Sequence, residues 1–211
     1  MSTKSKSLDP GHPREIMPNV ESPLEIGRKL FYGIRKRKNY KKAIPYLRQA
    51  AKEGYVHAQF LLAFALAHGM GIKKDLGKAV FWYRRAARKD HPGALFNLAL
   101  AYEKGRGTPV DHRKALLFYK RAASLGDAEA QCNLGVLYRE GIGARRSLNE
   151  GVRWTKKAAS NGDAKAQYNL ALAYLGGEGV KSSEPLARRW LVRAGRRGHR
   201  RASQMLRRMA K

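Results

Sequence analysis

The chain has 211 residues, of which 43% are hydrophobic, and its formal net charge is +28. A single cysteine, Cys132, excludes an intramolecular disulfide framework, and the longest apolar run, residues 60–67, is far too short to span a bilayer. A chain of this length and composition can bury a core of its own, so we expect a folded domain.

The first 21 residues contain Pro10, Pro13 and Pro18, and we expect a flexible leader over residues 1–21. From residue 22 onward, one motif recurs at a spacing of 36 residues without an insertion. Its clearest copies are Ala58–Leu62, Ala94–Leu98, Ala130–Leu134 and Ala166–Leu170. A unit of this length cannot bury its own apolar face and is stabilised by stacking on its neighbours. Residues 22–211 are therefore predicted to form a solenoid of five units and a basic C-terminal capping helix.

Each unit is predicted to contain two helices joined by a turn. In one unit, Leu98, Ala101 and Tyr102 have the one-face spacing of a packed helix. Gly105 ends that helix, because glycine readily adopts the left-handed conformation found just past a last turn, and Asp111 caps the second helix. Small residues on the first helix are predicted to let the two backbones approach closely: Ala63, Ala99, Gly135 and Ala171.

These residues resemble the Sel1-like repeat, a relative of the tetratricopeptide repeat. Residues 130–143 follow the pattern Ala-x-x-x-Leu-Gly-x-x-Tyr-x-x-Gly-x-Gly, and residues 78–87 follow Lys-Ala-x-x-Trp-Tyr-x-x-Ala-Ala. The resemblance implies an all-α, right-handed α-solenoid of helix-turn-helix repeats that binds other proteins. Asp90 and Arg35 stand where glycines are expected, and Thr155 stands where a tyrosine is expected. These departures leave open the turn geometry at their positions, but not the fold.

The positive charge is concentrated at the two ends of the chain. Residues 1–56 carry +8 and residues 181–211 carry +10, whereas the much longer stretch 57–180 carries +10. A terminal repeat needs a polar face, but mixed signs would satisfy that need, so nearly pure positive charge suggests an acidic partner or a polyanion. The predicted basic patch comprises Arg35, Lys36, Arg37, Lys38, Arg188, Arg189, Arg196, Arg197, Arg200 and Arg201.

In tetratricopeptide-like solenoids, the first helix of each unit lines a concave groove that holds the ligand. If Leu98, Ala101 and Tyr102 face the core, the residues between them face this groove. The groove is predicted to be lined by Phe60, Phe64, Phe96, Asn97, Leu100, Asn133, Val136, Tyr168, Asn169 and Leu172, with Leu61 and Cys132 in the same rows. Because asparagine is disfavoured inside helices, the three asparagines either hold the backbone of an extended peptide or bond a neighbouring helix.

No pattern indicates catalysis, a cofactor or a metal. The paired glycines lack the third glycine and the preceding strand of a dinucleotide-binding fingerprint, and the six histidines have no metal-ligand spacing. The sequence therefore predicts a monomeric, non-enzymatic adaptor that binds an acidic or extended protein segment through its groove and basic ends. Two alternatives remain open: binding of nucleic acid or an anionic membrane by the basic ends, and neutralisation of a bacterial effector. The lone cysteine and the absence of an apolar run at the start indicate a reducing cytoplasm.

Overall fold

The computed structural model describes residues 21–34 and 37–210, which form eleven α-helices and no strand. The helices are α1 (Pro23–Tyr32), α2 (Tyr40–Lys52), α3 (Val56–His68), α4 (Leu76–Ala87), α5 (Pro92–Lys104), α6 (His112–Ser124), α7 (Ala128–Glu140), α8 (Leu148–Ser160), α9 (Ala164–Gly176), α10 (Glu184–Arg196) and α11 (Arg200–Met209). Of the predicted leader, only Glu21 lies within the described residues. All predicted site residues are described except Arg35 and Lys36, which lie outside the described ranges.

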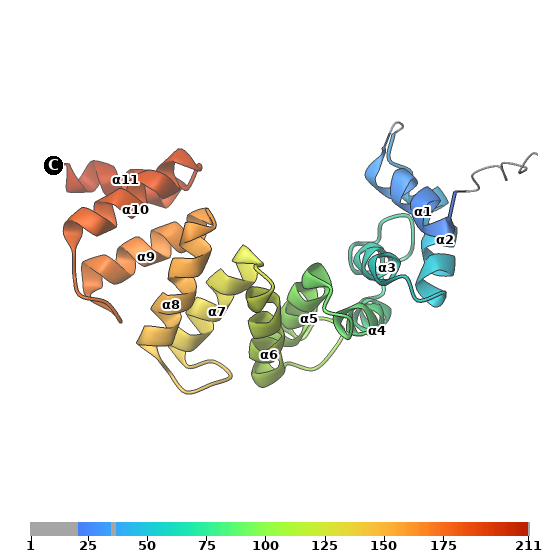
Figure 1. The fold of residues 1–211 in the computed structure, drawn as a ribbon, viewed down its shortest axis with the longest axis horizontal. Helices are drawn as coiled ribbons and strands as arrows, with labels where there is room; N and C mark the ends of the chain where they lie inside the picture. The colour runs from blue at the N-terminus through green and yellow to red at the C-terminus, as the bar shows by residue number, and fades with distance from the viewer. Residues whose placement is uncertain (1–20, 35–36, 211) are drawn as a thin grey trace, which may run out of the picture.

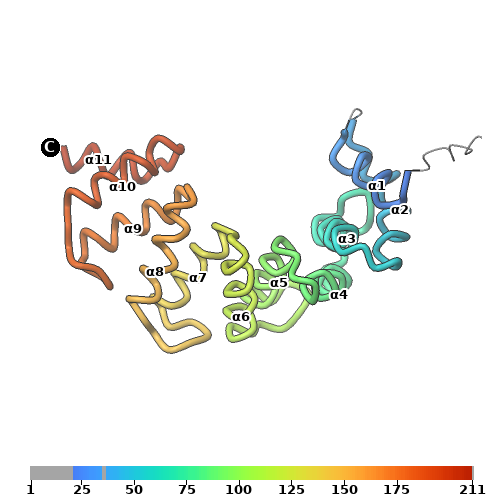
Figure 2. The backbone as a smooth tube through the Cα atoms, in the orientation of Figure 1, coloured from blue at the N-terminus to red at the C-terminus, as the bar shows by residue number. Residues whose placement is uncertain are grey.

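The helices stack in sequence order. Each helix packs mainly on the helices before and after it, and contacts between more distant helices are minor. Figure 1 shows the resulting arc, with α1 and α2 at one end and α10 and α11 at the other, both on the same side of its middle. The tube in Figure 2 shows that α4 and α6 lie along the lower, outer rim. The predicted right-handed α-solenoid is confirmed.

The two glycines of each turn have different structural roles. Gly105 caps α5 in the left-handed conformation at φ 65°, and its equivalents Gly69, Gly141 and Gly177 cap the other first helices in the same way. The second glycine, Gly107, has no room for a side chain, because a Cβ there would overlap the backbone of Leu76 at the start of α4. The first glycine therefore ends a helix, and the second lets one repeat pack against the backbone of the preceding repeat.

The departures from the repeat pattern keep the fold intact. Asp90 adopts the left-handed conformation of the missing glycine, at φ 53°, and its carboxylate pairs with the Arg121 guanidinium at 2.6 Å. Thr155 is buried, and its hydroxyl donates to the carbonyl oxygen of Gly151 at 2.8 Å. Both residues are therefore compatible with the backbone conformation of the repeat, although they depart from its sequence pattern.

A buried glutamine links successive helix pairs. The side-chain amides of Gln59, Gln131 and Gln167 donate to carbonyl oxygens at the ends of the preceding helices, at 3.0 to 3.2 Å. Leu95 stands at this position on α5 and cannot donate. There Arg121 reaches back and donates to the equivalent carbonyl oxygen, that of Ala87, at 3.0 Å. One arginine thus replaces the missing amide and also pairs with Asp90.

The predicted core face is correct, but two residues were assigned to the wrong side. Leu98, Ala101 and Tyr102 are buried as expected. Leu61 and Cys132 were expected in the groove, but their side chains are only 1% and 2% exposed. Leucine and cysteine are among the residues most often buried. At the border of a helix face, this tendency turns the side chain toward the core and away from the groove.

Candidate functional site

The ten predicted groove residues are all half-buried, and they lie on the first helices of four successive repeats. They are Phe60 and Phe64 on α3, Phe96, Asn97 and Leu100 on α5, Asn133 and Val136 on α7, and Tyr168, Asn169 and Leu172 on α9. The repeat thus spreads them along the arc, so that they form separate local groups and not one cluster.

Aromatic rings dominate the group nearest the N-terminal end. Phe60 stacks on His91 with ring centroids 4.4 Å apart, and Phe64 lies 4.3 Å from the ring of His68. Nδ1 of His57 is 3.2 Å from Nε2 of His91. Burial lowers the pKa of both His57 and His91, and the charge of Arg28 adds to the effect at His57. The two imidazoles are therefore held neutral, and this part of the surface is apolar and aromatic.

The asparagine row has contacts within the solenoid. Asn97 donates from Nδ2 to the carbonyl oxygen of Gly93 in its own helix at 2.7 Å, and Asn169 donates to the sulfur of Cys132 on α7 at 3.9 Å. The bond of Asn169 agrees with the alternative that an asparagine bonds a neighbouring helix, whereas the bond of Asn97 lies within α5. Each amide still has a second N–H group and a carbonyl oxygen that a ligand can contact.

Phe96 and Tyr168 also pack on neighbouring rings. Phe96 contacts Tyr119 edge to face, and Tyr168 stacks on His199 with centroids 4.5 Å apart. Val136 lies beside Asn169 in a narrow crevice between α7, α8 and α9, and Leu172 lines a separate, open hollow. These contacts join each first helix to its neighbours.

Asn97 and Leu100 line a pocket of about 390 Å³ between α3, α4 and α5. Its wall includes Tyr83, which is 3% exposed and whose hydroxyl has no hydrogen-bond partner among the described residues. Burial raises the pKa of Tyr83 far above its usual value, so the phenol stays protonated and can donate. A buried hydroxyl without a partner is costly, and a ligand that accepts its hydrogen bond would remove that cost.

Comparison with the next repeat explains why this hydroxyl has no partner. One repeat later, the equivalent Tyr119 donates to Oε2 of Glu103 at 2.6 Å. The residue that corresponds to Glu103 in the pocket is Ala67, which has no carboxylate. Lys74 and Arg106 also line the pocket, and no acidic residue does. The pocket is therefore lined by two cations and by a tyrosine whose buried hydroxyl lacks the carboxylate partner found one repeat later.

The predicted site residues do not include Tyr83. The sequence does show that Ala67 stands where the next repeat has Glu103, but only the structure shows that the hydroxyl of Tyr83 therefore has no partner and lies beside a pocket.

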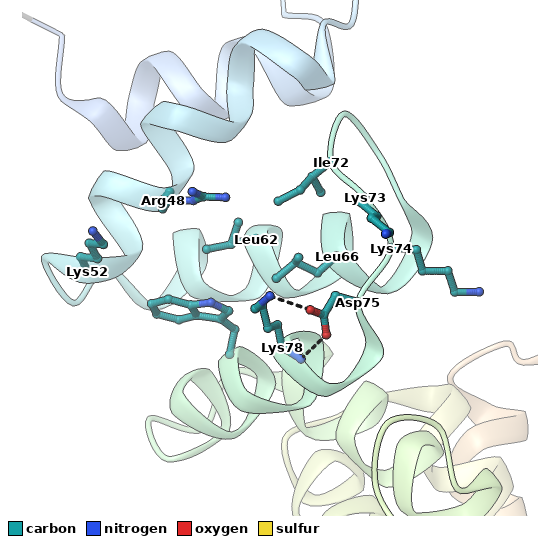
Figure 3. A pocket seen from close by; sticks show the side chains of 10 residues that line it. Arg48, Lys52, Leu62, Leu66, Ile72, Lys73, Lys74, Asp75 and Lys78 are labelled. Carbon is teal, nitrogen blue, oxygen red and sulfur yellow. Dashed lines mark hydrogen bonds and ion pairs between the residues drawn. The ribbon is translucent and has the colours of Figure 1, made fainter.

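A second pocket, of about 560 Å³, lies between α2, α3 and α4 and the loop that follows α3. Figure 3 shows Leu62 and Leu66 beneath it and cationic side chains around it. The cations are Arg48, Lys52, Lys73, Lys74 and Lys78. The one carboxylate, that of Asp75, pairs with Lys78 at 2.8 Å and caps α4, so it neutralises little of the surrounding charge. None of the site residues predicted from the sequence lines this pocket.

The structure separates the predicted basic patch into two parts. Arg37 and Lys38 are exposed just before α2, at the end of the arc opposite α10 and α11 (Figure 1). Arg189 and Arg196 are exposed along α10, where with Pro185 and Val192 they line a hollow of about 470 Å³. Arg200 and Arg201 are exposed at the start of α11. A partner would have to span the whole arc to meet both parts.

Two arginines of the C-terminal part also support the fold. Arg188 donates to the carbonyl oxygen of Met209 at 3.0 Å and to Glu184 at 3.2 Å, so it holds α11 against α10. The guanidinium of Arg197 lies over Gly162, in the turn of the preceding repeat. These two side chains are less free to meet a partner than the other arginines of the patch.

Within residues 21–34 and 37–210, no group of three or more histidine, cysteine or acidic side chains could hold a metal ion. None of the helices described for this chain is long and apolar enough to cross a membrane.

Five Sel1 repeats match the chain, at residues 25–55, 56–91, 92–127, 128–163 and 164–199. None of the curated proteins compared with the chain matches it significantly. Among solved structures, a Sel1 repeat protein from Oxalobacter formigenes is 31% identical, with a TM-score of 0.82 over 90% of this chain and 78% of that one.

A protective antigen of uropathogenic Escherichia coli that displays the same kind of repeat fold is 30% identical, with a TM-score of 0.84. The match covers 89% of this chain but only 40% of the antigen, so this chain corresponds to less than half of it. An immunity protein from Pseudomonas aeruginosa is 23% identical, with a TM-score of 0.54 over 90% of this chain and 70% of that one, and shares the fold alone. Sel1 repeats generally mediate protein–protein interaction. The five matched repeats cover most of the sequence, and the chain therefore belongs to the Sel1 repeat family.

Proposed function

We propose that this protein is a non-enzymatic, monomeric adaptor that holds an acidic, extended segment of a partner protein along the first helices of its repeats. The observation that carries the proposal is the pocket of Tyr83, where a buried hydroxyl has no acceptor and no carboxylate is present. A glutamate or aspartate of the partner would supply the carboxylate that Glu103 supplies to Tyr119 in the next repeat.

The charge distribution supports the same class of partner. Lys74 and Arg106 flank the pocket, and the arginines of α10 and α11 are opposed by a single carboxylate, that of Glu184, within residues 181–211. Exposed cations attract an acidic chain over long range and raise its association rate. The pocket and the asparagine row act only on contact, so they should govern the lifetime of the complex.

The chain offers a sharp test with a matched control. Tyr83→Phe removes only the unpartnered hydroxyl, so it should leave the melting temperature unchanged or raise it. It should weaken binding of a fluorescently labelled polyglutamate peptide by about tenfold, because a charge-assisted hydrogen bond is lost. Tyr119→Phe removes a hydroxyl that is already paired with Glu103 and should lower stability without changing the affinity.

Two further variants separate the association rate of the partner from the lifetime of the complex. Replacing Arg196, Arg200 and Arg201 by glutamine should slow association and reduce its dependence on salt. Changing Asn133 and Asn169 to alanine should shorten the lifetime of the complex and leave the association rate unchanged. If Tyr83→Phe binds as tightly as the unchanged protein, the carboxylate does not occupy the pocket, and the proposed site is wrong.

The same measurements decide between the proposal and its rivals. Binding of duplex DNA or of anionic vesicles that exceeds peptide binding, and collapses between about 50 and about 200 mM salt, would indicate a phosphate-binding protein instead. A partner that proves to be a toxic effector would make neutralisation the purpose of the same surface. We also propose that the protein works in a reducing cytoplasm, because its single cysteine, Cys132, cannot form the intramolecular disulfides on which many secreted domains depend.

A further inference from the structure

The pocket between α2, α3 and α4 exists because one residue of α3 is smaller than its counterparts. Leu66 lies at its base. The equivalent residue is a tyrosine in each of the next three repeats, at Tyr102, Tyr138 and Tyr174. The first seam between repeats therefore lacks a phenol ring that the later seams contain.

The next seam shows how that ring is held. Tyr102 stacks on Phe118 with centroids 5.7 Å apart and planes within 3° of parallel. Its hydroxyl accepts a hydrogen bond from Arg84 at 2.8 Å, and the ammonium group of Lys114 lies 5.4 Å from the ring centroid. One aromatic side chain, one arginine and one lysine thus contact the ring and the hydroxyl of this tyrosine.

The first seam contains the same three kinds of group without the tyrosine. Trp82 corresponds to Phe118, Arg48 to Arg84 and Lys78 to Lys114, and all three line the pocket of about 560 Å³. Arg48 is exposed and has no hydrogen-bond or ion-pair partner among the described residues. Figure 3 shows Arg48 on one side of the opening and Lys78 on the other, with Leu66 between them.

We propose that this pocket binds a tyrosine side chain of a partner protein, taken from a segment with acidic residues on both sides. The phenol ring packs against Trp82 over the floor made by Leu62 and Leu66, and its hydroxyl accepts a hydrogen bond from Arg48. The flanking carboxylates meet Lys52, Lys73 and Lys74, which no acidic residue of the pocket neutralises, since Asp75 is paired with Lys78.

The inference rests on the proposed function only in requiring a protein partner. It concerns a different surface, because the pocket of Tyr83 lies between α3, α4 and α5 and this one lies between α2, α3 and α4. Lys74 alone lines both pockets. Variants of Tyr83 and of Leu66 therefore test the two proposals separately.

The decisive variant is Leu66→Tyr, which fills the pocket with the residue of the other repeats. The probe is the labelled peptide Glu-Glu-Tyr-Glu-Glu, and its matched controls carry phenylalanine or alanine in place of tyrosine. The full chain should bind the tyrosine peptide at least about tenfold more tightly than the alanine peptide, with the phenylalanine peptide between them. Leu66→Tyr should abolish this preference while melting at or above the temperature of the unchanged protein.

A second variant keeps the test decisive if Leu66→Tyr does not fold. Arg48→Gln changes an exposed side chain, and it should reduce the affinity for the tyrosine peptide to that for the phenylalanine peptide. Tyr83→Phe should leave the preference for tyrosine unchanged, even if the proposed function fails. The proposal is overturned if the tyrosine and alanine peptides bind equally, or if folded Leu66→Tyr or Arg48→Gln keeps the full preference for tyrosine.

Discussion

The packing of α7 on α8 yields the sharpest prediction about stability. Gly135 and Gly151 face each other there, at positions where the helix pairs α3–α4, α5–α6 and α9–α10 have alanines. A Cβ on Gly135 would lie 2.9 Å from the carbonyl oxygen of Gly151 and would overlap the hydroxyl of Thr155. Gly135→Ala should therefore force the two helices apart and break the hydrogen bond from Thr155 to Gly151.

The magnitude follows from three effects. Alanine gains about 1 kcal/mol over glycine in a helix interior. Overpacking against a backbone that cannot yield costs about 1 to 3 kcal/mol, and the lost hydrogen bond costs about 1 kcal/mol more. The losses exceed the gain, so we expect a net destabilisation of about 1 to 3 kcal/mol, or about 2 to 12 °C in melting temperature.

Circular dichroism melts of three variants and of the unchanged protein test this prediction. Gly77→Ala, in α4, is the matched control, since a Cβ there meets only a carboxylate oxygen of Asp75 at 3.6 Å. The control should gain up to about 1 kcal/mol. Gly135→Leu should melt lower than Gly135→Ala. A Gly135→Ala protein that melts as high as the Gly77→Ala control would show that the α7–α8 contact is not tight.

Three other predictions concern single features of the solenoid. Asp90→Gly should raise stability by about 0.5 kcal/mol in a thermal melt, because relief of the left-handed strain outweighs an exposed ion pair, whereas Asp90→Ala should lower it. Gln131→Leu should lose about 1 to 2 kcal/mol in urea unfolding, because no arginine replaces its bond to Ala123, and an unchanged midpoint would refute this. The pKa values of His57 and His91 are lowered in the folded state, so the unfolded chain binds more protons and stability should fall as pH drops through about 6.5. A double change of His57 and His91 to glutamine should flatten that pH dependence.

The repeat itself could be predicted from the sequence because its landmarks are local. Gly105 ends a helix and Asp111 begins the next through backbone chemistry within a few residues, and both have the predicted conformations. The spacing of Leu98, Ala101 and Tyr102 likewise located the buried face. Periodicity reports which residues share a face, but it does not resolve residues at the edge of that face, which is why Leu61 and Cys132 were misplaced.

The sequence by itself determined the number of repeats, the all-α class and the excess of positive charge at both ends, because these depend on composition and on spacing along the chain. Only the tertiary structure decided where the surface has pockets that can bind a ligand. Leu66 and Ala67 are ordinary helix residues in the sequence, yet each lines a pocket at a position where the next repeat has a larger side chain, that of Tyr102 or Glu103. A pocket is the space left between side chains from three helices, and that space depends on how the repeats stack.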